Sequence, residues 1–174
     1  NAQNYLAALA VAKALQIDWT ALKDGLAVEL PSGRAKSYKL AEDIVILDET
    51  YNAGLESMLA ALNLLAQTPG QRRIAVLGTM KELGERSAQI HRQVGATVRE
   101  LNLDGLLILT DDPQATEIAE GAAPFKSECF STHEAVVERL QEIVQPGDRI
   151  LFKASHSVGL DRVVDRFRSQ FTNL

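Results

Sequence analysis

The chain has 174 residues, of which 46% are hydrophobic and 24% are charged. These values are typical of a globular domain and argue against a disordered, collagen-like or coiled-coil chain. Eighteen lysines and arginines against 23 aspartates and glutamates give a net charge of −5. A general nucleic-acid or anionic-membrane binder carries a basic surface, so this balance argues against both.

Cys129 is the only cysteine, which leaves no intrachain disulfide and no cysteine-based zinc site. We expect this thiol to be buried and unreactive, in a reducing cytoplasmic setting. No run approaches the roughly 20 apolar residues of a membrane span, and the N-terminus lacks the pattern of a signal peptide. Because the chain opens without Met in an Ala/Leu-rich helical pattern, we expect it to be a piece of a longer protein.

Taken in chain order, the sequence begins with helical periodicity and then changes rhythm. Residues 1–16 predict a helix, Asp18 is placed to cap a short helix over 19–26, and Pro31 and Gly33 indicate a linker. Apolar runs then alternate with helix-length segments. We predict strands at 36–40, 44–47, 74–78, 106–109, 129–130 and 150–152, and helices at 55–67, 86–101, 113–121, 133–145 and 158–170. Asp111-Asp112-Pro113 and Ser131-Thr132 are sequences that start helices.

Short, continuously apolar strands separated by helices predict a parallel sheet covered on both faces. We therefore expect an α/β, Rossmann-like, doubly wound and mostly parallel sheet over residues 32–174, preceded by a helical tail, residues 1–31, of a neighbouring domain. Ligands of such sheets bind beyond the carboxyl ends of the strands. That rule directs attention to residues 48–54, 78–84, 111–112 and 153–157.

Two of these stretches carry groups suited to ligand binding. The turn from Asp48 to Gly54 offers carboxylates, hydroxyls and an amide for ribose hydroxyls or a polar substrate; alternatively, Thr50 or Asn52 merely caps a helix. Lys153 and the Ser-His-Ser that follows Ala154 collect positive charge and N–H donors suited to a carboxylate or phosphate. The alternative there is a capped helix and a solvated lysine.

The remaining stretches carry weaker signals. Residues 78–84 form neither a GxGxxG fingerprint nor a GxxxxGK[ST] phosphate loop, and we interpret them as a structural loop. His91 and His133 are interpreted as packed or surface histidines rather than catalysts. A Ser-His hydrolase is disfavoured because the chain has no G-x-S-x-G elbow.

Taken together, these segments resemble the Mur ligases, and within them the branch that adds D-alanyl-D-alanine. The resemblance runs over nearly the whole chain. It rests on Asn1-Ala-Gln-Asn4-Tyr-Leu-Ala-Ala, on Arg34 after the linker, on Ile46-Leu-Asp-Glu-Thr-Tyr-Asn-Ala53, on Gly78-Thr-Met-Lys-Glu-Leu-Gly84 followed by Ser87, His91 and Val94-Gly95, and on Lys153-Ala-Ser155.

The resemblance implies a ligase of peptidoglycan synthesis that uses ATP and Mg²⁺ to activate the carboxylate of a UDP-N-acetylmuramoyl tripeptide as an acyl phosphate. The amine of D-alanyl-D-alanine then attacks it. The chain would hold the last helices of the central ATPase domain (1–31) and the C-terminal domain (32–174). Matching positions imply a catalytic role for Lys153, nucleotide binding by Asn1, Asn4, Arg34, Asp48 and Glu49, and substrate binding by Tyr51, Asn52, Ser155 and His156.

The resemblance has further consequences, and two alternatives to it stay open. The phosphate loop and the Mg²⁺ ligands would lie in the missing central domain, so we expect no metal ligands in this chain and no activity of the chain alone. We also expect a cytoplasmic monomer with small-molecule substrates and with its own missing domains as partners. Ala154 and His156 stand where the family has Gly and Arg.

The alternatives are another Mur or folylpolyglutamate-type amide ligase, and a non-catalytic α/β binding module.

Overall fold

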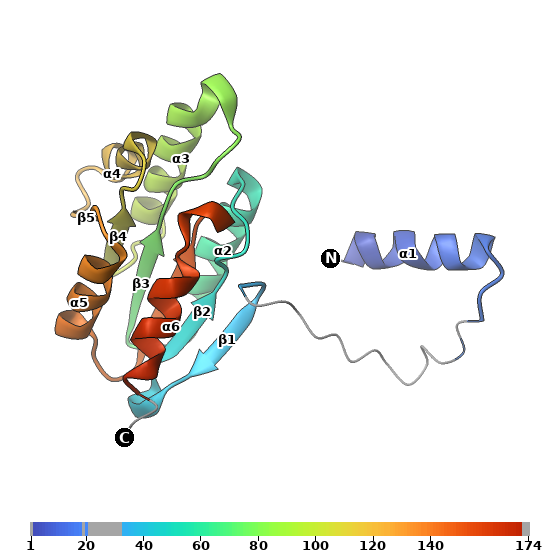
Figure 1. The fold of residues 1–174 in the computed structure, drawn as a ribbon, viewed down its shortest axis with the longest axis horizontal. Coiled ribbons are helices and arrows are strands. Elements are labelled where there is room, and N and C mark those ends of the chain that lie inside the picture. Colours follow the sequence, from blue (N-terminus) through green and yellow to red (C-terminus); the bar gives the residue numbers. More distant parts are fainter. Residues whose placement is uncertain (1, 19, 21–32, 172–174) are drawn as a thin grey trace.

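A computed structural model describes residues 2–18, 20 and 33–171 and shows one twisted sheet between two layers of helices (Figure 1). The sheet has six strands in the order β1-β2-β6-β3-β4-β5. Their bounds are β1 Lys36–Lys39, β2 Val45–Asp48, β3 Arg72–Leu77, β4 Gly105–Leu109, β5 Glu128–Phe130 and β6 Asp148–Lys153. Strand β1 pairs antiparallel with β2, and every other pair is parallel. The predicted α/β class and mostly parallel sheet are confirmed.

The helices pack on both faces of the sheet, as the unbroken apolar strands predicted. Helices α2 Leu55–Gln67, α3 Ser87–Glu100 and α4 Thr116–Ala122 bury their apolar side chains against one face. Helices α5 His133–Ile143 and α6 Asp161–Ser169 cover the other face (Figure 1). Central strands such as β3 place successive side chains in opposite layers, so that Ala75 and Leu77 belong to one core and Ile74 and Val76 to the other.

The last strand enters the middle of the sheet rather than its edge. The chain runs β2-α2-β3-α3-β4-α4-β5 along one face, and α5 then returns across the other face to insert β6 between β2 and β3. This reversal brings the end of β6 beside the end of β2, with Asp48 opposite Phe152 in the register. Such a reversal of strand order creates the crevice in which open α/β sheets bind ligands.

The caps predicted at Asp112 and Thr132 are present, and some helix bounds differ from the prediction. Asp112 accepts a hydrogen bond from Gln114 N–H at 2.9 Å, and Thr132 accepts one from Ala135 N–H at 3.2 Å. Helix α6 begins at Asp161 rather than 158 because residues 156–158 form a 3₁₀ turn ended by Gly159 at φ 72°. A left-handed residue of this kind terminates the turn before the α-helix starts.

Helices α3 and α4 approach each other more closely than side chains permit. A Cβ atom on Gly95 would lie 2.0 Å from Ile118 O, and one on Gly121 would lie 2.0 Å from Arg92 O. The two glycines therefore allow backbone-to-backbone packing between these helices, which the sequence motif Val94-Gly95 did not explain.

The expectation of a buried Cys129 is wrong. Its side chain is exposed, because β5 is a three-residue strand at the edge of the sheet.

At the N-terminus, α1 spans Ala2–Ala14, slightly shorter than the predicted helix over 1–16. Its large apolar side chains are open to solvent, with Leu6 62% and Val11 58% exposed. The short helix predicted over 19–26 and the domain boundary near 31 lie outside the described residues, apart from Thr20. Within the described part of the chain, no helix combines the length and apolar character needed to cross a membrane.

Candidate functional site

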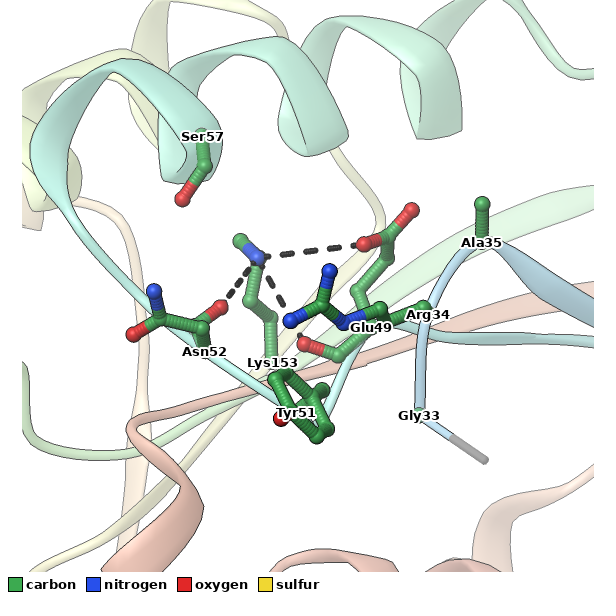
Figure 2. Close-up of a pocket in the computed structure, with 8 residues that line it drawn as sticks. All are labelled: Gly33, Arg34, Ala35, Glu49, Tyr51, Asn52, Ser57 and Lys153. Carbon is green, nitrogen blue, oxygen red and sulfur yellow. Dashed lines mark hydrogen bonds and ion pairs between the residues drawn. The ribbon is translucent and has the colours of Figure 1, made fainter. Parts of the chain in front are cut away.

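A pocket of about 480 Å³ opens at the carboxyl ends of β2 and β6, where the strand order reverses. Figure 2 shows its walls, which come from the segment before β1, the turn after β2, the first turn of α2 and the end of β6. The lining residues are Gly33, Arg34, Ala35, Glu49, Tyr51, Asn52, Ser57 and Lys153.

Lys153, the last residue of β6, lies at the centre of the pocket with a side chain that is only 2% exposed. Its ammonium donates to the Asn52 carbonyl at 2.7 Å, and the Glu49 carbonyl lies at 3.4 Å (Figure 2). The Glu49 carboxylate is 3.9 Å away. Burial lowers the pKa of the Lys153 ammonium below its usual value, and the Glu49 carboxylate opposes that shift. The interpretation of Lys153 as a solvated surface lysine is therefore wrong.

The turn after β2 orders itself through the buried Asp48. The Asp48 carboxylate accepts hydrogen bonds from Thr50 Oγ1 at 2.7 Å and from Thr50 N–H at 3.2 Å. Asp48 is 2% exposed and does not line the pocket, whereas its neighbour Glu49 does. Asp48 thus stabilises the turn, whereas the adjacent Glu49 faces the pocket.

The sequence left open that Thr50 or Asn52 caps the helix that follows, but neither residue caps α2. Its N-cap is Gly54, whose N–H donates to Ser57 Oγ at 3.1 Å while the Ser57 hydroxyl donates to the Gly54 carbonyl at 2.9 Å. The Asn52 side chain accepts from Ala53 N–H at 2.8 Å, which fixes the carbonyl that receives Lys153.

One wall of the pocket is a stack of planar groups. The Arg34 guanidinium carbon lies 3.9 Å from the centre of the Tyr51 ring. The Tyr51 and His156 rings are 5.5 Å apart and tilted by 33°. Tyr51 is 38% exposed, so this wall presents an amphipathic surface on which a flat or polar ligand group can lie.

Ser155 lies beside the pocket, in a polar network that joins the ends of β6, β3 and β4. Its hydroxyl accepts from Lys81 N–H at 2.9 Å, and its own N–H donates to the Thr79 carbonyl at 3.0 Å. The Lys81 ammonium pairs with Asp112 at 2.7 Å, and Thr79 Oγ1 donates to Asp111 at 3.0 Å. The segments 78–84, 111–112 and 153–157 flagged from sequence therefore meet in one network.

The structure brings most of the predicted site residues to this edge of the sheet. Arg34, Glu49, Tyr51, Asn52 and Lys153 line the pocket. Asp48, Ser155 and His156 lie directly behind or beside it. Asn1 and the side chain of Asn4 lie outside the described residues.

Sequence reasoning missed the contributions of Gly33, Ala35 and Ser57 to the pocket. Ser57 stands three residues after Gly54, at the position where a side chain bonds back to the first residue of a helix, and that spacing was the available signal. Gly33 has φ 75°, and a Cβ atom there would lie 2.7 Å from Thr50 Oγ1. Only glycine permits this close approach of the segment before β1 to the turn after β2.

The donor set suits an anionic or hydroxyl-rich ligand. An ammonium has three N–H donors, and the Lys153 ammonium has a single short hydrogen bond, to Asn52. A phosphate or carboxylate oxygen therefore fits as a further acceptor, with the Arg34 guanidinium and the Ser57 hydroxyl on the same walls. No group of three or more His, Cys, Asp or Glu side chains that could hold a metal ion occurs among residues 2–18, 20 and 33–171.

Comparison with known proteins identifies the family. The family model described as "Mur ligase, glutamate ligase domain" matches residues 33–156, and the chain belongs to this family. It is 55% identical over 170 residues to the UDP-N-acetylmuramoyl-tripeptide--D-alanyl-D-alanine ligase of Synechocystis sp., covering 98% of this chain and 37% of that protein. The Escherichia coli protein of the same name is 35% identical, with 94% and 36% covered.

Solved structures agree with the sequence relatives. The MurF ligase of Thermotoga maritima in complex with ADP superimposes with a TM-score of 0.80 at 30% identity, covering 98% of this chain and 38% of that one. A MurF structure from Acinetobacter baumannii gives a TM-score of 0.83 at 30% identity, covering 96% of this chain and 37% of that chain. The chain thus spans a little over a third of the length of these relatives.

Proposed function

We propose that this chain is the C-terminal part of an ATP-dependent ligase that joins D-alanyl-D-alanine to UDP-N-acetylmuramoyl tripeptide. The observation that carries the proposal is the 55% identity to the Synechocystis ligase over 98% of this chain. In the proposed division of the chain, residues 1–31 form the last helices of the central ATPase domain and residues 32–174 form the C-terminal domain. The solvent-exposed apolar side chains of α1 are in keeping with a helix that packs against further protein.

In the proposed reaction the tripeptide carboxylate takes the γ-phosphoryl group of ATP, which releases ADP and forms an acyl phosphate. The dipeptide amine then attacks the acyl carbon, loses a proton and displaces phosphate to form the amide bond. Such chemistry requires cations near the phosphoryl oxygens and a site that excludes water. The buried Lys153 ammonium, fixed by Asn52 and Glu49, meets the first requirement. We assign it the role of stabilising negative charge on the transferring phosphoryl group.

The remaining pocket residues receive roles that follow from their positions. Glu49, which faces the pocket, is assigned to the ribose hydroxyls rather than Asp48, whose carboxylate is engaged by Thr50. Arg34 is assigned to the nucleotide, in line with the ADP bound to the Thermotoga relative. We assign Tyr51, Asn52, Ser155 and His156 to the dipeptide side, and Asn1 and Asn4 to the adenine.

Mg²⁺ is expected to bind in the central domain rather than here. Among the described residues no group of three or more His, Cys, Asp or Glu side chains could hold a metal ion, and the sequence has no GxxxxGK[ST] phosphate loop. We therefore propose that this chain alone is inactive and that closure of the domains of a monomeric, cytoplasmic parent enzyme completes the site.

Phosphate release by the complete parent protein tests the proposal. The protein is supplied with ATP, Mg²⁺ and UDP-N-acetylmuramoyl tripeptide, and D-alanyl-D-alanine, D-glutamate or diaminopimelate is offered separately. We expect turnover with D-alanyl-D-alanine and no turnover with either of the other two amines. Turnover with another amine would move the specificity within the family, and no turnover with any amine would favour a non-catalytic binding module. Turnover by the 174-residue chain alone would refute its proposed inactivity.

A further inference from the structure

His91 lies outside the pocket but is connected to it through the loop after β3. The side chain projects from α3 and is fully buried. Its Nε2 accepts a hydrogen bond from Met80 N–H at 2.9 Å, and its Nδ1 lies 2.8 Å from the Ser87 carbonyl oxygen. The imidazole thus bridges the first turn of α3 and the loop 78–84.

The partners of the ring assign its tautomer. A carbonyl oxygen only accepts, so the proton is on Nδ1 and is donated to Ser87; a backbone N–H only donates, so Nε2 carries its lone pair toward Met80. An apolar side chain of similar size would fill the space but leave the buried Met80 N–H without an acceptor. The position therefore requires an acceptor as well as volume.

Lys81, the residue after Met80, connects the loop held by His91 to the edge of the pocket. Lys81 N–H donates to Ser155 Oγ at 2.9 Å, and Ser155 N–H donates to the Thr79 carbonyl at 3.0 Å. The Ser155 segment continues directly from Lys153 at the end of β6. A path of hydrogen bonds thus runs from the buried His91 through the backbone of Met80 and Lys81 to the Ser155 hydroxyl.

The other side of the same segment has a different anchor. His133, at the start of α5, donates from Nε2 to the Val158 carbonyl at 2.8 Å. The 3₁₀ turn that carries His156 is therefore held from α5, while Ser155 is held through the loop after β3. Ser155 and His156 are both assigned to the dipeptide side. The His133 bond ends on the Val158 backbone, whereas the His91 path ends on the Ser155 hydroxyl itself.

We propose that His91 is a positioning residue, which acts through Met80 and Lys81 to fix the Ser155 hydroxyl for the incoming dipeptide. This inference rests on the proposed function. The Met80 N–H needs the Nε2 acceptor to hold the loop, and the loop presents the Lys81 N–H that orients Ser155. Loss of that acceptor leaves the fold of the sheet intact and displaces one wall of the dipeptide site.

Two polar substitutions in the complete parent enzyme test the role of Nε2. In His91→Gln the side-chain oxygen reaches about as far as Nε2 and can accept from Met80 N–H, whereas in His91→Asn the amide reaches only to the position of Nδ1. We expect His91→Asn to lower kcat/KM for D-alanyl-D-alanine by roughly 10²-fold, the effect of displacing a positioned group by about 1 Å. We expect His91→Gln to retain most of the activity, and both variants to keep the wild-type KM for ATP.

A double-mutant comparison tests the path to Ser155. Ser155→Ala removes the acceptor of Lys81 N–H, so combining it with His91→Asn should add little to the loss that either causes alone. Additive losses of kcat/KM in the double variant would overturn the inference. Equal losses in His91→Gln and His91→Asn would also overturn it, and so would a rise in the KM for ATP as large as the loss in kcat/KM for the dipeptide. If His91→Asn does not fold, unchanged dipeptide kinetics in Ser155→Ala would overturn it.

The wild-type enzyme distinguishes failure of the positioning role of His91 from failure of the proposed function. Dipeptide-dependent turnover by the wild type with no difference among the variants would refute the role of His91 and leave the proposed function standing. Absence of dipeptide-dependent turnover in the wild type would refute the proposed function and the positioning role with it.

Discussion

Replacing Lys153 with methionine separates the charge of this side chain from its packing. Methionine retains an unbranched apolar stem of similar length but lacks the ammonium. The substitution therefore removes the contacts of Nζ with Asn52 and Glu49 and leaves most of the buried volume filled.

The expected effect on stability is small because large terms oppose each other. Burying an ammonium costs several kcal/mol. The 2.7 Å bond to the Asn52 carbonyl returns about 1.5–3 kcal/mol. The Glu49 carboxylate at 3.9 Å returns about 1–4 kcal/mol, depending on the effective dielectric constant. Burial lowers the pKa of Lys153 in spite of the Glu49 carboxylate, so desolvation is the larger of these two influences on the pKa. Because these terms nearly cancel, we expect Lys153→Met to change the free energy of unfolding by about 2 kcal/mol or less in either direction.

The expected effect on catalysis is large. Loss of one positioned group that stabilises transition-state charge typically lowers kcat by about 10²–10³-fold. Phosphate release by the complete parent enzyme measures this loss, and urea unfolding of this chain measures the stability. Lys126→Met is the matched control, since it makes the same chemical change at an exposed lysine outside the pocket.

Two results would refute the reasoning. Wild-type turnover in Lys153→Met would show that the ammonium does not act on the phosphoryl group. Destabilisation well beyond that of Lys126→Met would show that the ammonium is chiefly a structural tie between β6 and the turn after β2.

Further predictions concern pH, packing and the stacked wall of the pocket. Because burial lowers the pKa of Lys153, the unfolded chain binds more protons between that lowered value and the ordinary value of about 10.4. The unfolding free energy of the wild type should therefore rise with pH relative to Lys153→Met across this window, and denaturant titrations at alkaline pH showing no difference would contradict it. Gly95→Ala should cost at least about 1–3 kcal/mol, since its Cβ would lie 2.0 Å from Ile118 O; an unchanged melting temperature would refute the close contact. Tyr51→Leu should weaken ADP binding by the complete enzyme about two- to fivefold, because it removes the ring beneath Arg34. Tyr51→Phe keeps the ring and should bind ADP as the wild type does, as calorimetric titration can check.

Much of the local structure followed from the sequence. The period of apolar residues predicted α2 at its observed bounds, 55–67, and the polar residues before α5 and the turn at 113 predicted their caps. These features depend on contacts within a few residues of one another, which a sequence displays directly. The rule for parallel sheets also directed attention to the strand ends where the pocket lies.

The tertiary structure decided which of these residues meet. Insertion of β6 between β2 and β3 places Lys153 against the carbonyls of Glu49 and Asn52 and buries it. The same arrangement turns Glu49 toward the pocket and Asp48 toward Thr50, although the two acids are adjacent in sequence. Edge position, in turn, leaves Cys129 exposed. Strand order and burial arise from contacts between distant segments, and no local pattern encodes them.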